Sequence, residues 1–216
     1  MDMKQGRCDA LLERHGRSFA SELGVDISRN TPSPLFRVFT FALLASTRIS
    51  ADIAMHAARA LAAQGWTTAA GMAQATWRER TDALNRAGYA RYDEKTSSQL
   101  ADSCAHLLDQ YHGDLRQLRQ RAERDPGFER KRLKQCKGIG DVGVDIFFRE
   151  TQAAWPELYP FADKLSLRAA RHLELGNSAG DLAQWVDRAT YPRFVAALVR
   201  CELAGSHADI VNAAPR

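Results

Sequence analysis

The stretch from Gln135 to Glu150, QCKGIGDVGVDIFFRE, has the pattern of a helix, a tight turn and a second helix. Gly138 and Gly140 lie two residues apart, and glycines at this spacing let the backbone turn through conformations with positive φ. Asp141 follows at the N-cap position of an apolar-periodic helix. The turn amides and the new helix N-terminus together predict a small site for one anion, such as a phosphate.

The residues that lead into this turn are strongly basic. Residues 116–137 include nine basic and three acidic side chains, a net charge of +6, whereas the whole chain carries +4 with a pI near 9.0. The rest of the chain is therefore nearly neutral, at −2. One interpretation of this basic stripe is a clamp on the DNA backbone. The other is a solvated helix face with i,i+4 ion pairs.

Length and composition set the class of protein. A chain of 216 residues, 45% hydrophobic and 26% charged, is long enough for one large domain or two small lobes. The longest apolar runs are far too short to span a membrane, and residues 1–17 are polar without a secretory signal. We therefore expect a cytoplasmic protein, in contact with nucleoid DNA. The four cysteines and six histidines are scattered without zinc spacing, which predicts free thiols and no metal site.

Apolar residues recur with a helical period along most of the chain, and no sustained alternation predicts a strand. The fold class is therefore predicted to be all-α. Ser33 and Pro34 are expected to start a buried central helix over residues 35–46, and the tail from His207 is expected to fray. The four tryptophans are assigned to the core. The other predicted helices cover residues 11–23, 50–64, 68–74, 76–85, 93–112, 162–174, 181–188 and 192–204.

Four features occur in order along the chain: TPSPLF with LLAST (31–36 and 43–47), AGYARYDEK (87–95), CKGIGDVG (136–143) and PFADKLSLRAARHLELG (160–176). Together they resemble the helix-hairpin-helix DNA glycosylase superfamily, to which endonuclease III belongs, over roughly residues 31 to 176. Gly138-Ile139-Gly140 matches the family hairpin. Residues 162–169 match the family stretch that holds the catalytic aspartate, which puts Asp163 on that aspartate.

The resemblance implies a base-excision repair enzyme that hydrolyses the N-glycosidic bond of a damaged or modified base, with Asp163 as the catalytic carboxylate. Family members that also cleave the strand have a lysine where this chain has Val142, so a monofunctional glycosylase is expected. The four-cysteine iron–sulfur loop of the family is missing, because Cys201 is the only cysteine after the hairpin. Further departures are Lys137 for the hairpin proline, Thr47 followed by Arg48 for a glutamine, and Leu165 for a histidine or aromatic residue.

The resemblance also implies two helical lobes with a DNA-binding cleft between them. One lobe covers residues 34–140, and the other combines residues 1–33 with residues 141–216. Family hairpins bind backbone phosphate through their amides, with a monovalent cation at the turn carbonyls and no other implied cofactor. The expected partner is double-stranded DNA, bound by a monomer. The predicted DNA-binding residues are Lys134, Lys137, Gly138, Ile139, Gly140, Val142 and Gly143.

A glycosylase must flip its target nucleotide, fill the gap and hold the base. Tyr89 is the candidate wedge, and Arg48, at the end of the buried helix, is placed on the base or the opposite strand. Tyr92 and Lys164 are candidates for the pocket lining, and Arg168 is expected to form a structural salt bridge.

Asp163 itself has two interpretations. An ionised carboxylate near the sugar stabilises the positive charge that builds up there and can align or deprotonate the attacking water. Asp163 follows Pro160 at the start of a helix, where the N–H groups favour the ionised form. An aspartate just after a proline break is also a common N-cap with no catalytic role.

Two other functions are consistent with the sequence. The chain could be a non-catalytic protein of the same fold that binds DNA by its structure, since the lysine, the cluster and the glutamine are absent. It could also be an all-α protein–protein module whose basic stripe meets an acidic partner.

Overall fold

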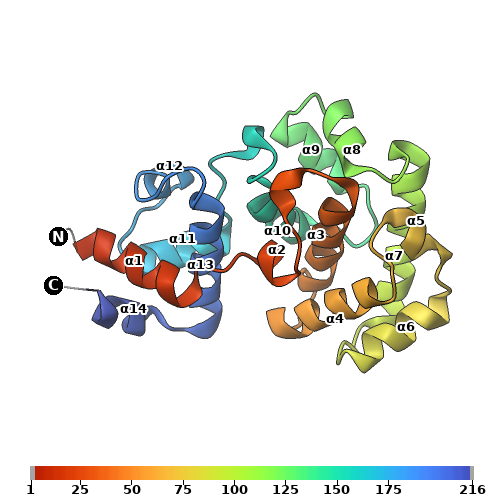
Figure 1. The fold of residues 1–216 in the computed structure, drawn as a ribbon, viewed down its shortest axis with the longest axis horizontal. Coiled ribbons are helices and arrows are strands. Elements are labelled where there is room, and N and C mark those ends of the chain that lie inside the picture. Colours follow the sequence, from red (N-terminus) through yellow and green to blue (C-terminus); the bar gives the residue numbers. More distant parts are fainter. Residues whose placement is uncertain (1–2, 215–216) are drawn as a thin grey trace. The chain divides into compact units, whose positions relative to one another are not determined.

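The computed structural model describes residues 3–214, and these residues form helices and no β-strand (Figure 1). The all-α prediction is confirmed. None of the helices described is long and apolar enough to cross a membrane.

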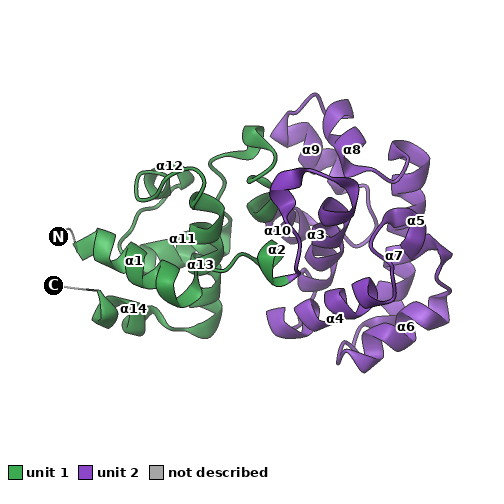
Figure 2. Cartoon of the chain, in the orientation of Figure 1, with its two compact units in different colours: residues 1–22, 148–216 green, residues 23–147 purple. Residues whose placement is uncertain are grey.

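The chain divides into two compact units (Figure 2). Unit 2 is the continuous segment 23–147, and unit 1 combines residues 1–22 with residues 148–216. The sequence predicted the boundaries at 33/34 and 140/141. Both observed boundaries enlarge the continuous unit because the flanking segments pack onto its central helix. Arg37 donates to the carbonyl of Leu23, and the ring of Phe39 meets Phe147 edge to face at 6.4 Å.

Unit 2 is arranged around α3 (Pro32–Ala45). The side chains of this helix are apolar nearly all round, and those of Leu35, Phe39 and Leu43 are at most 1% exposed. The N-cap is Thr31 and Pro32 occupies the first turn, two residues earlier than predicted. A proline at the first helical position loses no hydrogen bond, so the first proline of the TPSP stretch already starts the helix.

Short polar caps start the next helices of unit 2. The hydroxyls of Ser50, Thr68 and Thr76 accept from backbone amides, and Thr76 forms a capping box with Glu79. α6 and α5 both pack on the long α7. The elements of unit 2 are η1 (Ile27–Arg29), α3, α4 (Ala51–Ala63), α5 (Ala69–Gln74), α6 (Trp77–Arg86), α7 (Asp93–Tyr111), α8 (Leu115–Arg121), α9 (Pro126–Leu133) and most of α10 (Asp141–Thr151).

Unit 1 packs its helices around α13 (Tyr191–Ala204). Its core joins the two ends of the chain, since Leu11 of α1 is buried in one cluster with Phe194 and Leu198 of α13 and Ile210 of α14. Figure 1 shows α1 beside α13, and α14 beside α1. The remaining elements of unit 1 are α1 (Met3–His15), α2 (Phe19–Glu22), η2 (Pro156–Leu158), α11 (Lys164–His172), α12 (Ala179–Leu182) and α14 (His207–Ala213).

Two predictions for unit 1 are wrong. The helix expected over residues 181–188 is only the four-residue α12, because the indole N–H of Trp185 donates to the carbonyl of Leu175 at 2.6 Å and the chain turns there. The tail expected to fray from His207 instead forms α14, anchored by the fully buried Ile210.

The assignment of the tryptophans to the core holds only in part. Trp155 is fully buried, whereas Trp77 is 45% exposed. Trp77 begins α6, and its indole N–H donates to the Ser98 hydroxyl at 3.2 Å, so the ring covers the surface of α7 instead of entering the core.

Candidate nucleic-acid interface

The turn between α9 and α10 is a tight hairpin in which the two glycines have different roles. Gly138 has a φ of +89°, and the amide of Ile139 donates to the Cys136 carbonyl at 3.1 Å. Of the two glycines, both expected from the sequence to permit positive φ, Gly138 adopts it and Gly140 does not. A Cβ added to Gly140 would meet nothing within 4 Å, which means that its backbone borders open space.

The N-terminal end of α10 follows directly. The first bond of its helical ladder runs from the amide of Val144 to the carbonyl of Gly140 at 3.0 Å. The amides of residues 141–143 precede that bond, so they have no partner in the helical ladder. Val142 is 58% exposed at this end. Amides at such a helix end can bind an anion, and the anion site at this turn stays a prediction.

Contacts with α3 and α7 fix the hairpin. The Ser103 hydroxyl of α7 donates to the carbonyl of Lys137 at 2.6 Å. Ile139 is buried, and a Cβ added to Gly143 would lie 3.3 Å from the Cδ1 of Ile139 and 3.6 Å from Ser46. The glycine at 143 thus lets α10 approach the end of α3 closely.

Part of the basic stripe is neutralised by acids of α10. Lys134 Nζ lies 2.9 Å from Asp141 Oδ1, and Arg130 pairs with Asp145 at 2.6 Å. Arg116 of α8 likewise pairs with Asp114 at 2.7 Å. Of the predicted contact residues before the turn, Lys134 therefore has an internal partner, while Lys137 is exposed and forms no ion pair with a described residue.

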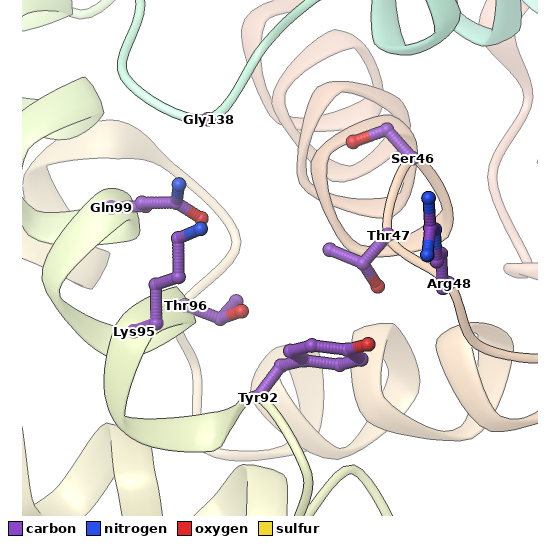
Figure 3. Close-up of a pocket in the computed structure, with 8 residues that line it drawn as sticks. All are labelled: Ser46, Thr47, Arg48, Tyr92, Lys95, Thr96, Gln99 and Gly138. Carbon is purple, nitrogen blue, oxygen red and sulfur yellow. The ribbon is translucent and has the colours of Figure 1, made fainter.

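A cavity of about 450 Å³ opens in unit 2 next to the hairpin. Figure 3 shows the end of α3 on one side, the start of α7 on the other, and the hairpin loop with Gly138 above. The lining is polar and cationic rather than apolar, and it consists of Ser46, Thr47, Arg48, Tyr92, Lys95, Thr96, Gln99 and Gly138.

Of the predicted pocket residues, Arg48 and Tyr92 line this cavity together with Gly138 of the hairpin. Sequence reasoning missed Lys95 and Gln99, which lie in the first two turns of α7. The only signals that could have found them are the basic side chain and the i,i+4 spacing, which puts both on one face of the helix. Arg48 and Lys95 are exposed, and neither forms an ion pair with a residue that the structure describes. Two cations without an ion pair to a described residue therefore border the cavity.

Tyr89 does not fit the role of a wedge. Its side chain is fully buried, and its hydroxyl is bonded to the Leu44 carbonyl at 2.9 Å and to the Thr47 hydroxyl at 2.8 Å. Burial raises the pKa of Tyr89. A wedge must protrude into the base stack, whereas Tyr89 supports the end of α3 from inside.

Asp163 lies in unit 1, at the N-cap of α11, and both of its carboxylate oxygens are engaged. Oδ1 accepts from the amide of Ser166 at 2.8 Å, and Oδ2 accepts from Arg149 Nη1. Asp163 is 7% exposed and Arg149 is 4% exposed. This buried ion pair was not foreseen from the sequence, where the two residues are 14 positions apart.

Glu150 extends this buried cluster. Its Oε2 accepts from the amide of Ala20 at 2.9 Å, and its Oε1 lies 3.5 Å from Arg149 Nε. Burial raises the pKa of Glu150, against the opposing effect of Arg149. One guanidinium therefore serves two buried carboxyl groups.

Lys164 and Arg168 lie on α11 in unit 1. Lys164 is exposed and is not among the residues that line the cavity of unit 2. Arg168 forms the predicted salt bridge, with Nε 2.5 Å from Glu202 Oε1.

The cysteines offer no ligand set in the described residues. All four are buried thiols outside any disulfide. Burial raises the pKa of Cys104 and of Cys136 to about 12, which disfavours the thiolates that metals bind.

No protein family model matches the chain. No curated protein matches it either. A solved structure to which the chain is similar is that of a trapped endonuclease III–DNA covalent intermediate, in an estranged-adenine complex. The two chains are 15% identical, the match covers 76% of this chain and 71% of that one, and the TM-score is 0.48.

Proposed function

We propose that this protein binds the backbone of double-stranded DNA through the hairpin of residues 137–143 and the cationic cavity beside it. The observation that carries the proposal is that the N-terminal end of α10 lies next to a cavity bordered by cationic side chains. The amides of residues 141–143 precede the helical ladder, and Arg48 and Lys95 border the adjoining cavity. Amides at a helix N-terminus bind phosphate, and lysine or arginine side chains nearby add the charge attraction that DNA binding requires.

We further propose, from the sequence resemblance, that the bound DNA is a substrate and that a damaged or modified base is excised by hydrolysis. In that reaction the bond between base and sugar breaks, the oxygen of a water molecule bonds to the sugar carbon, and the departing base takes a proton. Asp163 would stabilise the positive sugar and receive the proton of the water. With Val142 in place of the lysine, the strand would stay intact, and the proposal includes no iron–sulfur cluster.

The second candidate function is DNA binding without catalysis. It is favoured by the engagement of both oxygens of Asp163 with Ser166 and Arg149. A carboxylate already paired with a buried guanidinium has less capacity to stabilise a new positive charge. In this case Asp163 is the N-cap and ion-pair partner of its own unit.

The binding proposal is tested by fluorescence anisotropy of a labelled duplex across a range of salt concentrations. Lys95→Glu and Lys137→Glu should each weaken binding by about tenfold and lower the slope of log affinity against log salt by about 1. Arg86→Glu is the matched control, because Arg86 lies in the same unit but lines a different cavity. Equal loss in all three variants, or no affinity for DNA at low salt, would refute the binding proposal and favour an acidic protein partner.

The catalytic proposal is tested by mass spectrometry of bases released from a pool of lesion-containing duplexes. A base released by the wild type and not by Asp163→Asn supports excision, because asparagine keeps an N-cap acceptor while removing the charge. Circular dichroism of the variant confirms that it is folded. DNA binding with no release from any lesion would leave the non-catalytic function.

A further inference from the structure

The C-terminal end of unit 1 gathers three potential metal ligands that the sequence scatters. His172 is the last residue of α11, Glu202 lies near the end of α13, and His207 is the first residue of α14. Their donor atoms all lie within 4.8 Å of one another. Scattered histidines without a metal site were expected from the sequence, whereas packing brings these two histidines together with Glu202.

The three donor atoms form a small triangle. His172 Nδ1 lies 3.4 Å from His207 Nε2 and 3.5 Å from Glu202 Oε2. His207 Nε2 lies 2.9 Å from the same Glu202 oxygen. Ligands bound tetrahedrally to Zn²⁺ at 2.0–2.1 Å are separated by about 3.3 Å. Two sides of the triangle are close to that value, and the third needs to open by only a few tenths of an ångström.

We propose that His172, Glu202 and His207 bind one divalent transition-metal ion, Zn²⁺ in preference to Mg²⁺ or Ca²⁺. Two imidazole nitrogens and one carboxylate oxygen form a donor set that suits zinc, whereas magnesium and calcium favour oxygen ligands alone. Three protein ligands leave the fourth position of the tetrahedron to water or to another ligand.

The surroundings orient the carboxylate for this role. Glu202 is 8% exposed in its side chain, and its other oxygen, Oε1, accepts from Arg168 Nε at 2.5 Å. This contact holds Glu202 with Oε2 directed to the two histidines, which is how outer partners commonly fix a metal-binding carboxylate.

A metal ion here would join the ends of three helices. α14 has only seven residues, and its contacts with the body of unit 1 include the buried Ile210 and the His207–Glu202 contact. In the structure without metal, His172 and His207 contact each other and Glu202 accepts from His207, and the ion would replace these contacts with coordination bonds.

The test is a titration of tag-free, chelator-treated protein with Zn²⁺ in competition with a chromophoric chelator. We expect one equivalent bound by the wild type, and binding weakened by at least about tenfold in His172→Ala and in His207→Ala. His172 has 54% of its side chain exposed, so its removal should leave the fold intact. His56→Ala is the matched control, since it removes an exposed histidine from α4 in unit 2.

A second measurement separates binding at this site from binding elsewhere. Zn²⁺ should slow amide hydrogen exchange in α14 of the wild type and of His56→Ala, and not in His172→Ala. No stoichiometric binding by the wild type would overturn the proposal. So would a full equivalent retained by both His172→Ala and His207→Ala.

Discussion

At the start of α11 the carboxylate of Asp163 accepts from the helix amide of Ser166, whereas α10 begins after Gly140, which has no side chain to do so. The first of these helix ends, that of α11, is capped by a side chain of the protein itself, and this cap is buried together with Arg149. The second is exposed, and an added Cβ on Gly140 would meet no atom within 4 Å. The same element, a helix N-terminus, is thus capped inside the protein in unit 1 and begins at an exposed turn in unit 2.

The charges around the two helix ends differ in the same way. In unit 1 a single buried guanidinium lies next to two buried carboxyl groups, so the charge near Asp163 has its partner inside the protein. Around the cavity of unit 2, Arg48 and Lys95 are exposed, without an ion pair to a described residue. A surface with unpaired charge has electrostatic energy to gain from a ligand, and a buried pair has little left to gain. This contrast supports the hairpin as a binding element more strongly than it supports Asp163 as a catalyst.

The largest effect is expected from Arg149→Met. Removing one partner of a buried ion pair leaves uncompensated charge in the interior, and here both Asp163 and Glu150 would lose their cation. We expect a loss of about 3–5 kcal/mol in the free energy of unfolding of unit 1. Amide hydrogen exchange in α11 and α13 measures this free energy separately from that of unit 2.

Arg14→Met is the matched control for this prediction. It makes the same substitution in the same unit, but the Arg14–Asp209 pair is about half exposed, so a loss below about 1 kcal/mol is expected. Similar losses in the two variants would show that Asp163 is not held by the buried pair. The contrast between the two helix ends would then disappear.

The next effect separates the two glycines of the hairpin. Gly138→Ala should destabilise unit 2 by about 1–2 kcal/mol, because alanine is strained at a φ of +89°. Its Cβ would also lie 3.0 Å from the side-chain amide of Gln99. Urea unfolding with exchange of the α7 amides measures the loss.

Gly140→Ala is the control in the same turn, and its expected result has a different pattern. With no positive φ and open space around it, the variant should be as stable as the wild type. If a phosphate approaches the backbone here, the added methyl group should nevertheless weaken DNA binding in the anisotropy assay. Unchanged affinity in Gly140→Ala would move the phosphate contact away from the open side of the turn.

The sequence predicted those features that depend on near neighbours. The α3 helix could be recognised because its apolar residues surround the whole helix, and the hairpin because two glycines precede an apolar-periodic helix. Asp141, predicted as the N-cap, is already the first residue of α10. The N-cap of α11 was foreseen from the proline break before Asp163. All of these signals lie within one or two helical turns.

The features that were missed depend on pairs far apart in the chain. Tyr89 was placed on the surface because it lies in a loop between helices, but its hydroxyl reaches a carbonyl 45 residues earlier. The cluster of His172, Glu202 and His207 forms only when three helix ends meet, and no spacing along the chain indicates it. Such contacts follow from packing, which local periodicity does not determine.

The smallest effect concerns the other acid of the buried cluster and has a sign that depends on pH. Burial raises the pKa of Glu150 in the folded protein above its ordinary value of 4.5, so folding favours the protonated carboxyl group. Its contribution to stability is fully present below pH 4.5 and is lost as the pH rises through the folded pKa. Glu150→Gln, which cannot titrate, should therefore gain in stability relative to the wild type between about pH 5 and pH 8.

This difference is measured as the melting temperature of Glu150→Gln minus that of the wild type across the same pH range, so that groups titrating alike in both proteins cancel. A difference that rises with pH means that the carboxylate is under-compensated, with Arg149 committed mainly to Asp163. A difference that falls with pH would mean that Arg149 stabilises ionised Glu150 instead. Asp163 would then be less fully paired than its contacts indicate, and the case for a catalytic carboxylate at the start of α11 would become stronger.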